Sequence, residues 1–458
     1  MKQIPAIAVV VTLAAGGAIA REPKPEETWP GFRGHEMSGV ALSSKVPVRW
    51  SANENVKWSV PIAGQGWSSP IVWGDTVFVT SAISGRPFKK PTPGLYGNEY
   101  IAEMQAQGLS NDEISKRAQA RDNEVPAESD AIRYMVYALD GKTGKIKWER
   151  EAIKTTPFGG RHRKNTYASE TPVTDGERVY AWFGTGQLVA LDAAGKQVWT
   201  KNLAKEYGAF DIQWGHASSP VLFQDSIILL CYHAPASYIL ALDKRTGAVK
   251  WKVDKAPGQE SYSSPIVVQG PGGNELIVNS NSGVESFDPA TGKSLWTYPE
   301  LNRFPIPVAM VDNGVLYLSR GYRSSPFMAI RLGGRGDITN THVAWRVPTG
   351  GPYVSSLVHY QGVIYMSTDN GILSAVDAAN GQRLWQERVG GTFSASPIAG
   401  DGKIYFVSEG GETIVIKAGR TFELVSRNKL DGHFVASPAA AAGRVFLRAD
   451  DRIFAIGK

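Results

Sequence analysis

A short turn-and-tryptophan pattern recurs along the chain and constrains the fold more than any other feature. In four copies an aspartate is followed by a threonine or asparagine, a glycine, and a tryptophan eight residues after the aspartate; these copies begin at Asp140, Asp243, Asp288 and Asp377. A fifth copy, from Asp192 to Trp199, is one residue shorter. Aspartate accepts backbone hydrogen bonds in tight turns and glycine adopts positive φ, so each copy predicts a hairpin whose second strand carries a large ring. A calcium loop is disfavoured because no acidic ligands follow at the required spacing.

Each repeat also carries a short Ser-Pro segment, complete or degenerate, before an apolar strand. These entries end at Pro70, Pro172, Pro220, Pro265, Pro307, Leu357, Pro397 and Pro438. From the second entry onward they are 40 to 50 residues apart, which is the length of a four-stranded blade. Alternating apolar residues between them favour strands over helices. The eight entries predict an all-β, eight-bladed β-propeller of four-stranded blades.

The two ends of the repeat region predict how the ring closes. The last repeat supplies three strands, at 438–442, 444–449 and 453–456, but no tryptophan strand. Near the start, residues 55–60 form a tryptophan strand that no blade precedes. Pairing this N-terminal strand with the C-terminal blade completes blade eight and hides both open edges. Blade seven is the weakest, because residues 422–425 replace its tryptophan strand.

Outside the repeats, the chain divides into three further segments. Residues 1–20 have the basic, apolar and small-residue regions of a signal peptide, and the apolar run is short for a membrane span. We therefore expect a soluble periplasmic or otherwise exported protein, with an N-terminal exported segment at 21–52, a propeller at 53–458 and no integral membrane segment after signal removal. An insertion at about 83–130 contains a helix-capping pattern, Ser110 to Glu113, and is interpreted either as a lid or partner-docking arm or as an inert surface excursion.

Composition argues against several classes of chemistry. The net charge of +6 is spread thinly, and the basic run 161–164 is too short to predict nucleic-acid binding. Cys231 is the only cysteine, so no intrachain disulfide is possible, and its apolar surroundings predict a buried strand residue. The seven histidines lack metal-ligand spacing, and no nucleophile elbow, phosphate loop or complete dinucleotide fingerprint is present. We assign no catalytic residue and expect no metal site.

The repeats resemble those of the PQQ-dependent quinoprotein dehydrogenases and of an outer-membrane assembly lipoprotein family that shares the propeller without the cofactor. The resemblance covers about residues 53–458 and implies that the tryptophans pack between blades as structural residues: Trp58, Trp148, Trp199, Trp251, Trp296, Trp345 and Trp385. In the dehydrogenases, the quinone typically lies between a tryptophan and a disulfide of adjacent cysteines, beside a calcium ion. A single cysteine excludes that disulfide, and no calcium-ligand set can be mapped onto this chain. No cofactor is therefore expected, with PQQ and Ca²⁺ as the alternative.

The candidate site is a ring of residues just before the Ser-Pro entries, where the innermost strands open on one face of the channel. Its members are mainly aromatic: Trp67, His216, Tyr262, Phe304, Tyr353, Phe393 and Phe434. Charged or polar residues placed near it are Arg161, His162, Glu170 and Arg303. Such a ring suits a ligand or peptide, although the same residues would also suit core packing between blades. The predicted function is a non-catalytic exported scaffold for a protein, peptide or cell-envelope ligand; the alternative is a PQQ-dependent oxidoreductase acting on alcohols or sugars.

Overall fold

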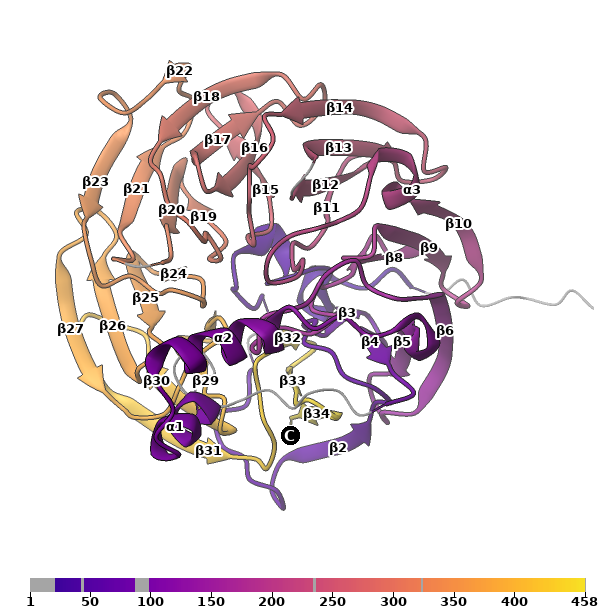
Figure 1. The fold of residues 1–458 in the computed structure, drawn as a ribbon. Coiled ribbons are helices and arrows are strands. Elements are labelled where there is room, and N and C mark those ends of the chain that lie inside the picture. Colours follow the sequence, from indigo (N-terminus) through magenta and orange to yellow (C-terminus); the bar gives the residue numbers. More distant parts are fainter. Residues whose placement is uncertain (1–20, 43–44, 87–98, 234–235, 323, 458) are drawn as a thin grey trace, which may run out of the picture.

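The computed structural model describes residues 21–42, 45–86, 99–233, 236–322 and 324–457. Eight sheets are arranged radially around a central channel, which confirms the predicted all-β, eight-bladed propeller (Figure 1). The predicted signal peptide at 1–20 lies outside the described residues.

The first four blades follow one another along the chain. The strands of each blade are given from the innermost to the outermost. Blade 1 contains β3 (Ile71–Trp73), β4 (Thr76–Ile83), β5 (Ile132–Asp140) and β6 (Ile146–Thr155). Blade 2 contains β7 (Val173–Thr174), β8 (Arg178–Phe183), β9 (Gln187–Asp192) and β10 (Gln197–Asn202). Blade 3 contains β11 (Val221–Phe223), β12 (Ser226–Tyr232), β13 (Ser237–Asp243) and β14 (Val249–Lys255). Blade 4 contains β15 (Ile266–Gly270), β16 (Gly273–Ser280), β17 (Gly283–Phe287) and β18 (Ser294–Pro299).

The remaining blades repeat this order until the chain returns to its start. Blade 5 contains β19 (Met310–Asp312), β20 (Val315–Ser319), β21 (Phe327–Arg331) and β23 (Val343–Val347). Blade 6 contains β24 (Val358–Tyr360), β25 (Val363–Ser367), β26 (Ile372–Asp377) and β27 (Arg383–Arg388). Blade 7 contains β28 (Ile398–Gly400), β29 (Lys403–Val407), β30 (Glu412–Lys417) and β31 (Leu424–Lys429). Blade 8 contains β32 (Ala439–Ala441), β33 (Arg444–Arg448), β34 (Arg452–Ile456) and, outermost, β2 (Val56–Pro61).

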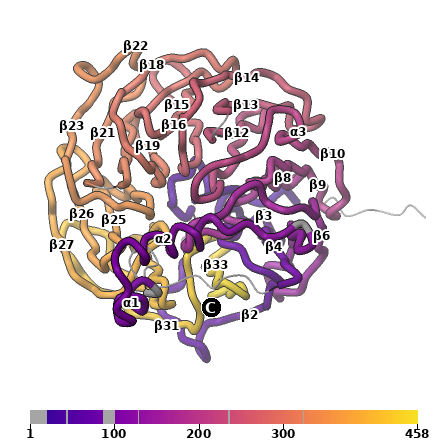
Figure 2. Tube along the Cα trace, in the orientation of Figure 1, coloured from indigo at the N-terminus to yellow at the C-terminus, as the bar shows by residue number. Residues whose placement is uncertain are grey.

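The ring closes by pairing the two ends of the repeat region, as the sequence predicts. β2 lies antiparallel to β34, with Val56 opposite Ile456 and Val60 opposite Ile453. Figure 2 shows the violet β2 beside the yellow C-terminal strands. Because β2 supplies the fourth strand, the edge of β34 is paired rather than open.

The turn pattern links neighbouring blades as well as closing a hairpin. The Asp243 carboxylate accepts hydrogen bonds from the backbone and hydroxyl of Thr246, which holds Gly247 at φ +74°. A Cβ on Gly247 would lie 2.9 Å from the Trp199 ring of the preceding blade. Trp199 in turn donates its indole N–H to the carbonyl of Lys244, which follows the aspartate. Trp58, Trp148, Trp251 and Trp345 donate to the equivalent carbonyl of the next blade.

Two tryptophans depart from this arrangement because the following turn pattern is absent. Blade 5 has a longer connection, whose β22 (Gly336–Asp337) adds in parallel to the outer strand of blade 4, and Trp296 donates instead to the buried Glu275. Trp385 packs edge-on against Phe422 in the irregular outer part of blade 7.

The N-terminal segment closes the rear of the channel. Its β1 (Thr28–Trp29) pairs with the innermost strand of blade 1, beside the helical turns η1 (Pro25–Glu27) and η2 (His35–Met37). Arg33 is buried and donates to carbonyls of Leu357 and Pro397, so one guanidinium joins this segment to blades 6 and 7. Further backbone hydrogen bonds reach blades 1, 2 and 8. The indigo chain lies behind the ring centre in Figure 1.

Three α-helices and one further helical turn complete the described structure. Helices α1 (Glu99–Ala106) and α2 (Asn111–Asp122) and the turn η4 (Glu128–Asp130) lie between β4 and β5, and α3 (Leu203–Tyr207) follows β10. Ser110 caps α2 by accepting from Glu113, as its sequence predicts. Asp122 of α2 forms a buried ion pair with Arg163 at 2.5 Å, which anchors this helix to the loop between β6 and β7. Among the described helices, none is long and apolar enough to cross a membrane.

Candidate functional site

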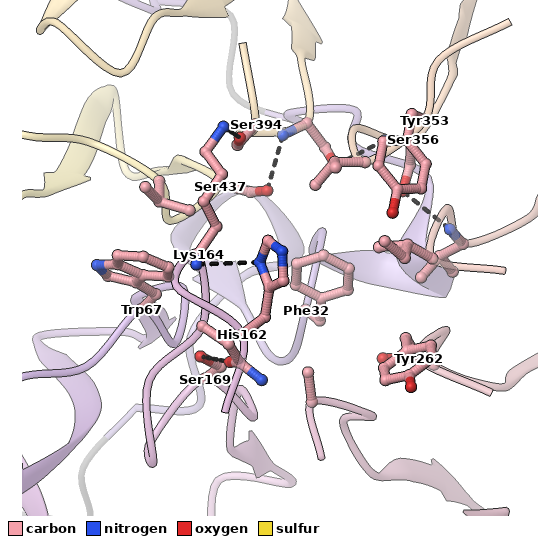
Figure 3. A pocket seen from close by; sticks show the side chains of 18 of the residues that line it. Phe32, Trp67, His162, Lys164, Ser169, Tyr262, Tyr353, Ser356, Ser394 and Ser437 are labelled. Carbon is pink, nitrogen blue, oxygen red and sulfur yellow. Dashed lines mark hydrogen bonds between the residues drawn. The ribbon is translucent and has the colours of Figure 1, made fainter. Parts of the chain in front are cut away.

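A cavity of about 200 Å³ lies at the front of the channel, where the innermost strands begin. Its lining includes four of the predicted site residues, namely Trp67, His162, Tyr262 and Tyr353 (Figure 3). Phe32 from the N-terminal segment also lines it, and Figure 3 shows this ring beside His162. We call this space the mouth cavity.

Serine hydroxyls around the mouth cavity hold successive blades together. In most blades the residue two positions before the innermost strand is a serine or threonine whose hydroxyl accepts the backbone N–H of the equivalent residue in the preceding blade. The pairs are Ser69 to Thr171, Thr171 to Ser219, Ser219 to Ser264, Val308 to Ser356, Ser356 to Ser396 and Ser396 to Ser437. In blade 5, Val308 holds this position, so the chain of hydroxyls is interrupted there. The Ser-Pro entries therefore fix the channel wall, and most of these hydroxyls also line the cavity.

One side of the mouth is a continuous run of aromatic rings, which we call the aromatic arc. It consists of Trp214, Tyr262, Phe304, Tyr322 and Tyr353. Neighbouring ring centroids are between 4.2 and 6.1 Å apart, so the rings are in contact along the arc. The arc runs from the loop before blade 3 to the entry of blade 6.

The other side of the mouth carries three carboxylates from equivalent turns of consecutive blades, which we call the acidic arc. Asp369, Glu409 and Asp450 each lie in the turn between the second and third strands of blades 6, 7 and 8. Lys164, from the loop between blades 1 and 2, lies 2.6 Å from Glu409 in a buried ion pair. Its side chain therefore reaches across the mouth to blade 7.

His433 supplies the second positive charge of the acidic arc. Its Nδ1 lies 3.1 Å from Asp450, and its Nε2 lies 3.7 Å from Glu409. Burial opposes the charged form, but these carboxylates outweigh it and raise the pKa of His433 to about 9. The indole N–H of Trp67 also donates to Asp450 at 2.7 Å. Glu409 and Asp450 are thus both compensated.

Asp369 differs from the other two carboxylates. It is only 8% exposed, and no described residue forms an ion pair with it or donates a hydrogen bond to its buried Oδ1. Burial raises the pKa of Asp369 to about 7; Lys164 lowers it and Glu409 raises it further. The mouth cavity therefore has in its wall a carboxyl group without an ion-pair partner among the described residues.

His162 is a neutral side chain at the centre of the mouth. Burial and the neighbouring positive charges of Arg163, Lys164 and Arg161 lower its pKa to about 3. Its Nδ1 accepts the backbone N–H of Lys164 at 3.1 Å, which leaves Nε2 as the N–H donor. The ring also packs edge-on against Trp214.

The other predicted site residues lie outside the cavity lining. His216 and Glu170 form a buried pair at 3.0 Å, where the histidine ring packs edge-on against Trp182 and Phe210. Burial raises the pKa of Glu170, and His216 partly offsets this shift. Arg161 donates to the Asn165 carbonyl and to Gln65, so it stabilises the loop between β6 and β7.

The remaining members of the predicted ring serve as wall or core. Arg303 stacks over the Phe304 ring, and Phe304 belongs to the aromatic arc. Phe393 and Phe434 are buried in hydrophobic clusters of blades 6 and 7 and of the blade 8 region, respectively. The structure thus brings four predicted residues to the cavity and leaves the others behind its wall.

Several residues that line the mouth cavity are not predicted by the repeat pattern. Trp214, Lys164 and Phe32 come from loops whose course is not periodic. The acidic arc does carry a signal, because positions 369, 409 and 450 recur at the spacing of the repeat. A comparison of the turns between second and third strands would have found it.

Comparisons with known proteins agree with this architecture. A family model described as outer membrane protein assembly factor BamB matches residues 133–303, 281–392 and 369–456. Tetrathionate hydrolase from Acidithiobacillus ferrooxidans is 28% identical over 296 residues, covering 60% of this chain and 53% of that protein. Outer membrane protein assembly factor BamB from Yersinia pestis is 24% identical over 313 residues, covering 68% of this chain and 65% of that protein. The chain thus spans about half to two thirds of the length of these curated relatives.

A solved structure extends the likeness across nearly all of the fold. Quinohemoprotein alcohol dehydrogenase from Comamonas testosteroni superposes with a TM-score of 0.61 at 12% identity, covering 95% of this chain and 81% of that chain. At this identity the likeness establishes a shared PQQ-like propeller and leaves the chemistry to the site itself.

Proposed function

Because the chain belongs to the family described as outer membrane protein assembly factor BamB, we propose that it is a non-catalytic scaffold that binds a protein or peptide of the cell envelope through the mouth cavity. The observation that carries this proposal is the composition of the mouth: an aromatic arc beside buried hydroxyls and carboxylates. Aromatic anchors with a few fixed polar groups are typical of recognition sites.

The place of action belongs to the same proposal. The basic, apolar and small-residue regions of residues 1–20 support export. We infer that the protein acts in the periplasm or an equivalent exported compartment, where a cell-envelope partner would meet the mouth.

Photocrosslinking tests the proposed surface directly. A photoreactive phenylalanine analogue at position 353 of the full-length protein, expressed in its own cells, is expected to capture a specific partner. The same analogue at Val249, an exposed position on the outer strand of blade 3, is the matched control and is expected to capture none.

The loss of the adduct in a second variant connects capture to the cavity. Tyr262→Ala removes a ring from the aromatic arc, so it should abolish the adduct at position 353. An adduct pattern that is identical at positions 353 and 249, or unchanged by Tyr262→Ala, would rule out the mouth as the binding surface.

A PQQ-dependent oxidoreductase acting on alcohols or sugars is the second candidate, favoured by the fold shared with quinohemoprotein alcohol dehydrogenase. The mouth cavity does not fit that cofactor well. PQQ carries three carboxylates, whereas Lys164, the one lysine or arginine among the described lining residues, is already paired with Glu409, and Asp369 adds a negative charge. Among the described residues, no three His, Cys, Asp or Glu side chains come together as metal ligands.

Retention of PQQ by the purified protein tests this second function. The purified protein is mixed with PQQ and Ca²⁺, desalted, and examined for quinone absorbance and for dye reduction with alcohols and sugars. We expect neither signal. Retained quinone together with dye reduction would replace the scaffold proposal.

A further inference from the structure

The three carboxyl groups of the acidic arc are not equally paired. Glu409 pairs with Lys164, and Asp450 pairs with His433. The Asp369 carboxylate lines the mouth cavity beside this pairing and has no cation of its own among the described residues. A buried carboxylate without a partner is costly, so such groups are uncommon away from sites that bind something.

The aromatic arc lines the same cavity. Tyr262 of this arc is among the lining residues, and its hydroxyl is buried beside the backbone N–H of Trp214. Tyr353 of the same arc belongs to the entry of blade 6, the blade that carries Asp369. The aromatic arc and the acidic arc therefore meet at blade 6.

This combination selects the charge of the ligand. Aromatic faces attract cations, and a carboxylate completes an ammonium site with a charge-assisted hydrogen bond. An anionic group would meet the repulsion of Asp369. A calcium ion would need six to eight oxygen ligands, and among the described residues no group of three or more His, Cys, Asp or Glu side chains is arranged to hold a metal ion.

Resting on the proposed function, we infer that the mouth cavity receives a lysine-type side chain of the bound peptide, with its ammonium paired to Asp369 and its methylene stem against the aromatic arc. The cavity is the size of a single large side chain and its neighbour rather than of a helix.

Two short peptides that differ in one charge test this assignment. Acetyl-Phe-Lys-amide and acetyl-Phe-norleucine-amide have the same stem length, but only the first carries an ammonium. Isothermal titration calorimetry of each peptide with the full protein is expected to show about tenfold or greater preference for the lysine peptide. Asp369→Asn should remove that preference and leave the norleucine peptide unaffected.

Asp451→Asn is the matched control. Asp451 lies in the turn of blade 8 that also holds Asp450, but its side chain is exposed and forms only a surface pair with Arg452. This variant removes the same formal charge from the same face and should retain the full preference for lysine. Thermal unfolding of both variants verifies that they are folded.

Three outcomes would overturn the inference. The first is equal affinity of the wild type for the two peptides, including no binding of either, and the second is an unchanged lysine preference in Asp369→Asn. The third is a titration with Ca²⁺ alone that binds the wild type, displaces the lysine peptide and is lost in Asp369→Asn, which would identify a metal site. Crosslinking at position 353 separates this inference from the proposed function: a specific adduct without lysine preference leaves the scaffold intact and removes only the ligand assignment.

Discussion

Asp369 shows how a single buried carboxyl group can oppose folding. In an unfolded chain an aspartate has a pKa of about 3.9, whereas burial raises the pKa of Asp369 to about 7. Between these values the folded protein retains a proton that the unfolded chain has released. The contribution of Asp369 therefore lowers the free energy of unfolding progressively as the pH rises from about 4 to 7. Above pH 7 this destabilisation reaches its full size.

Asp369→Asn should consequently stabilise the protein at pH 8. The expected gain is on the order of 2–4 kcal/mol, shrinking towards zero at pH 4.5, because the amide carries no charge at either pH. Urea unfolding at the two pH values measures it, with Asp451→Asn as the control that changes little. An Asp369→Asn protein that is less stable than wild type at pH 8 would contradict the unpaired state of this carboxylate.

His433 contributes with the opposite sign: it stabilises the folded protein, although this stabilisation is also lost as the pH rises. Asp450 and Glu409 raise the pKa of His433 from about 6.5 to about 9. Its contribution to folding stability is therefore complete below about pH 6.5 and is lost as the pH rises through about 9. His433→Gln should cost roughly 1–3 kcal/mol at pH 6, and the difference from wild type should narrow above pH 9. Chemical denaturation across this range tests the prediction. His342→Gln is the control, because His342 has no carboxylate at ion-pair distance in the described chain; a similar loss in both variants would count against the pairing.

At the scale of the element, the turn glycine Gly247 shows how a blade packs against the preceding blade. Gly247 combines a positive φ with direct contact to the Trp199 ring of the preceding blade. Gly258 also has a positive φ, but a Cβ placed there would meet nothing within 4 Å. The two positions therefore separate backbone strain from blade docking.

Gly247→Ala should destabilise the propeller more than Gly258→Ala. The control is expected to cost about 1–2 kcal/mol for the left-handed backbone alone, and Gly247→Ala roughly 1–3 kcal/mol more because the tryptophan must move. Differential scanning calorimetry of the two variants gives the comparison. Equal losses would show that the ring does not rest on the glycine.

The elements were predictable to the extent that their signals are local. The spacing from Asp243 to Trp251 predicts a hairpin because turn and strand are adjacent in sequence. The partner of the Trp199 ring is the turn of the next blade, 45 residues away, and only the family resemblance implied that packing. For the site, Tyr262 and Tyr353 follow from the repeat, whereas Lys164 reaches the cavity through an irregular loop that no periodicity describes.

At the scale of the whole molecule, stability depends on one seam between the start and the end of the propeller. Trp58 of β2 packs against Phe446 of blade 8 and donates to the Gly141 carbonyl of blade 1. It therefore contacts both blades that the closing strand joins.

Trp58→Ala should weaken this closure by about 3–5 kcal/mol, the usual cost of deleting a buried large ring. Lys57→Ala, at the exposed neighbouring position of β2, should change stability by about 0.5 kcal/mol or less. Denaturant unfolding of the two variants provides the test. A small effect at Trp58 would mean that the strand pairing closes the ring without this side chain.

The N-terminal segment across the rear of the channel has a consequence for how any partner must arrive. Phe32 of this segment lines the mouth cavity, and Arg33 ties the segment to blades 6 and 7. A peptide that binds as proposed above would meet this segment at the back of the cavity. It would therefore enter and leave by the front face, presenting a chain terminus, a loop or a single side chain instead of passing through the ring.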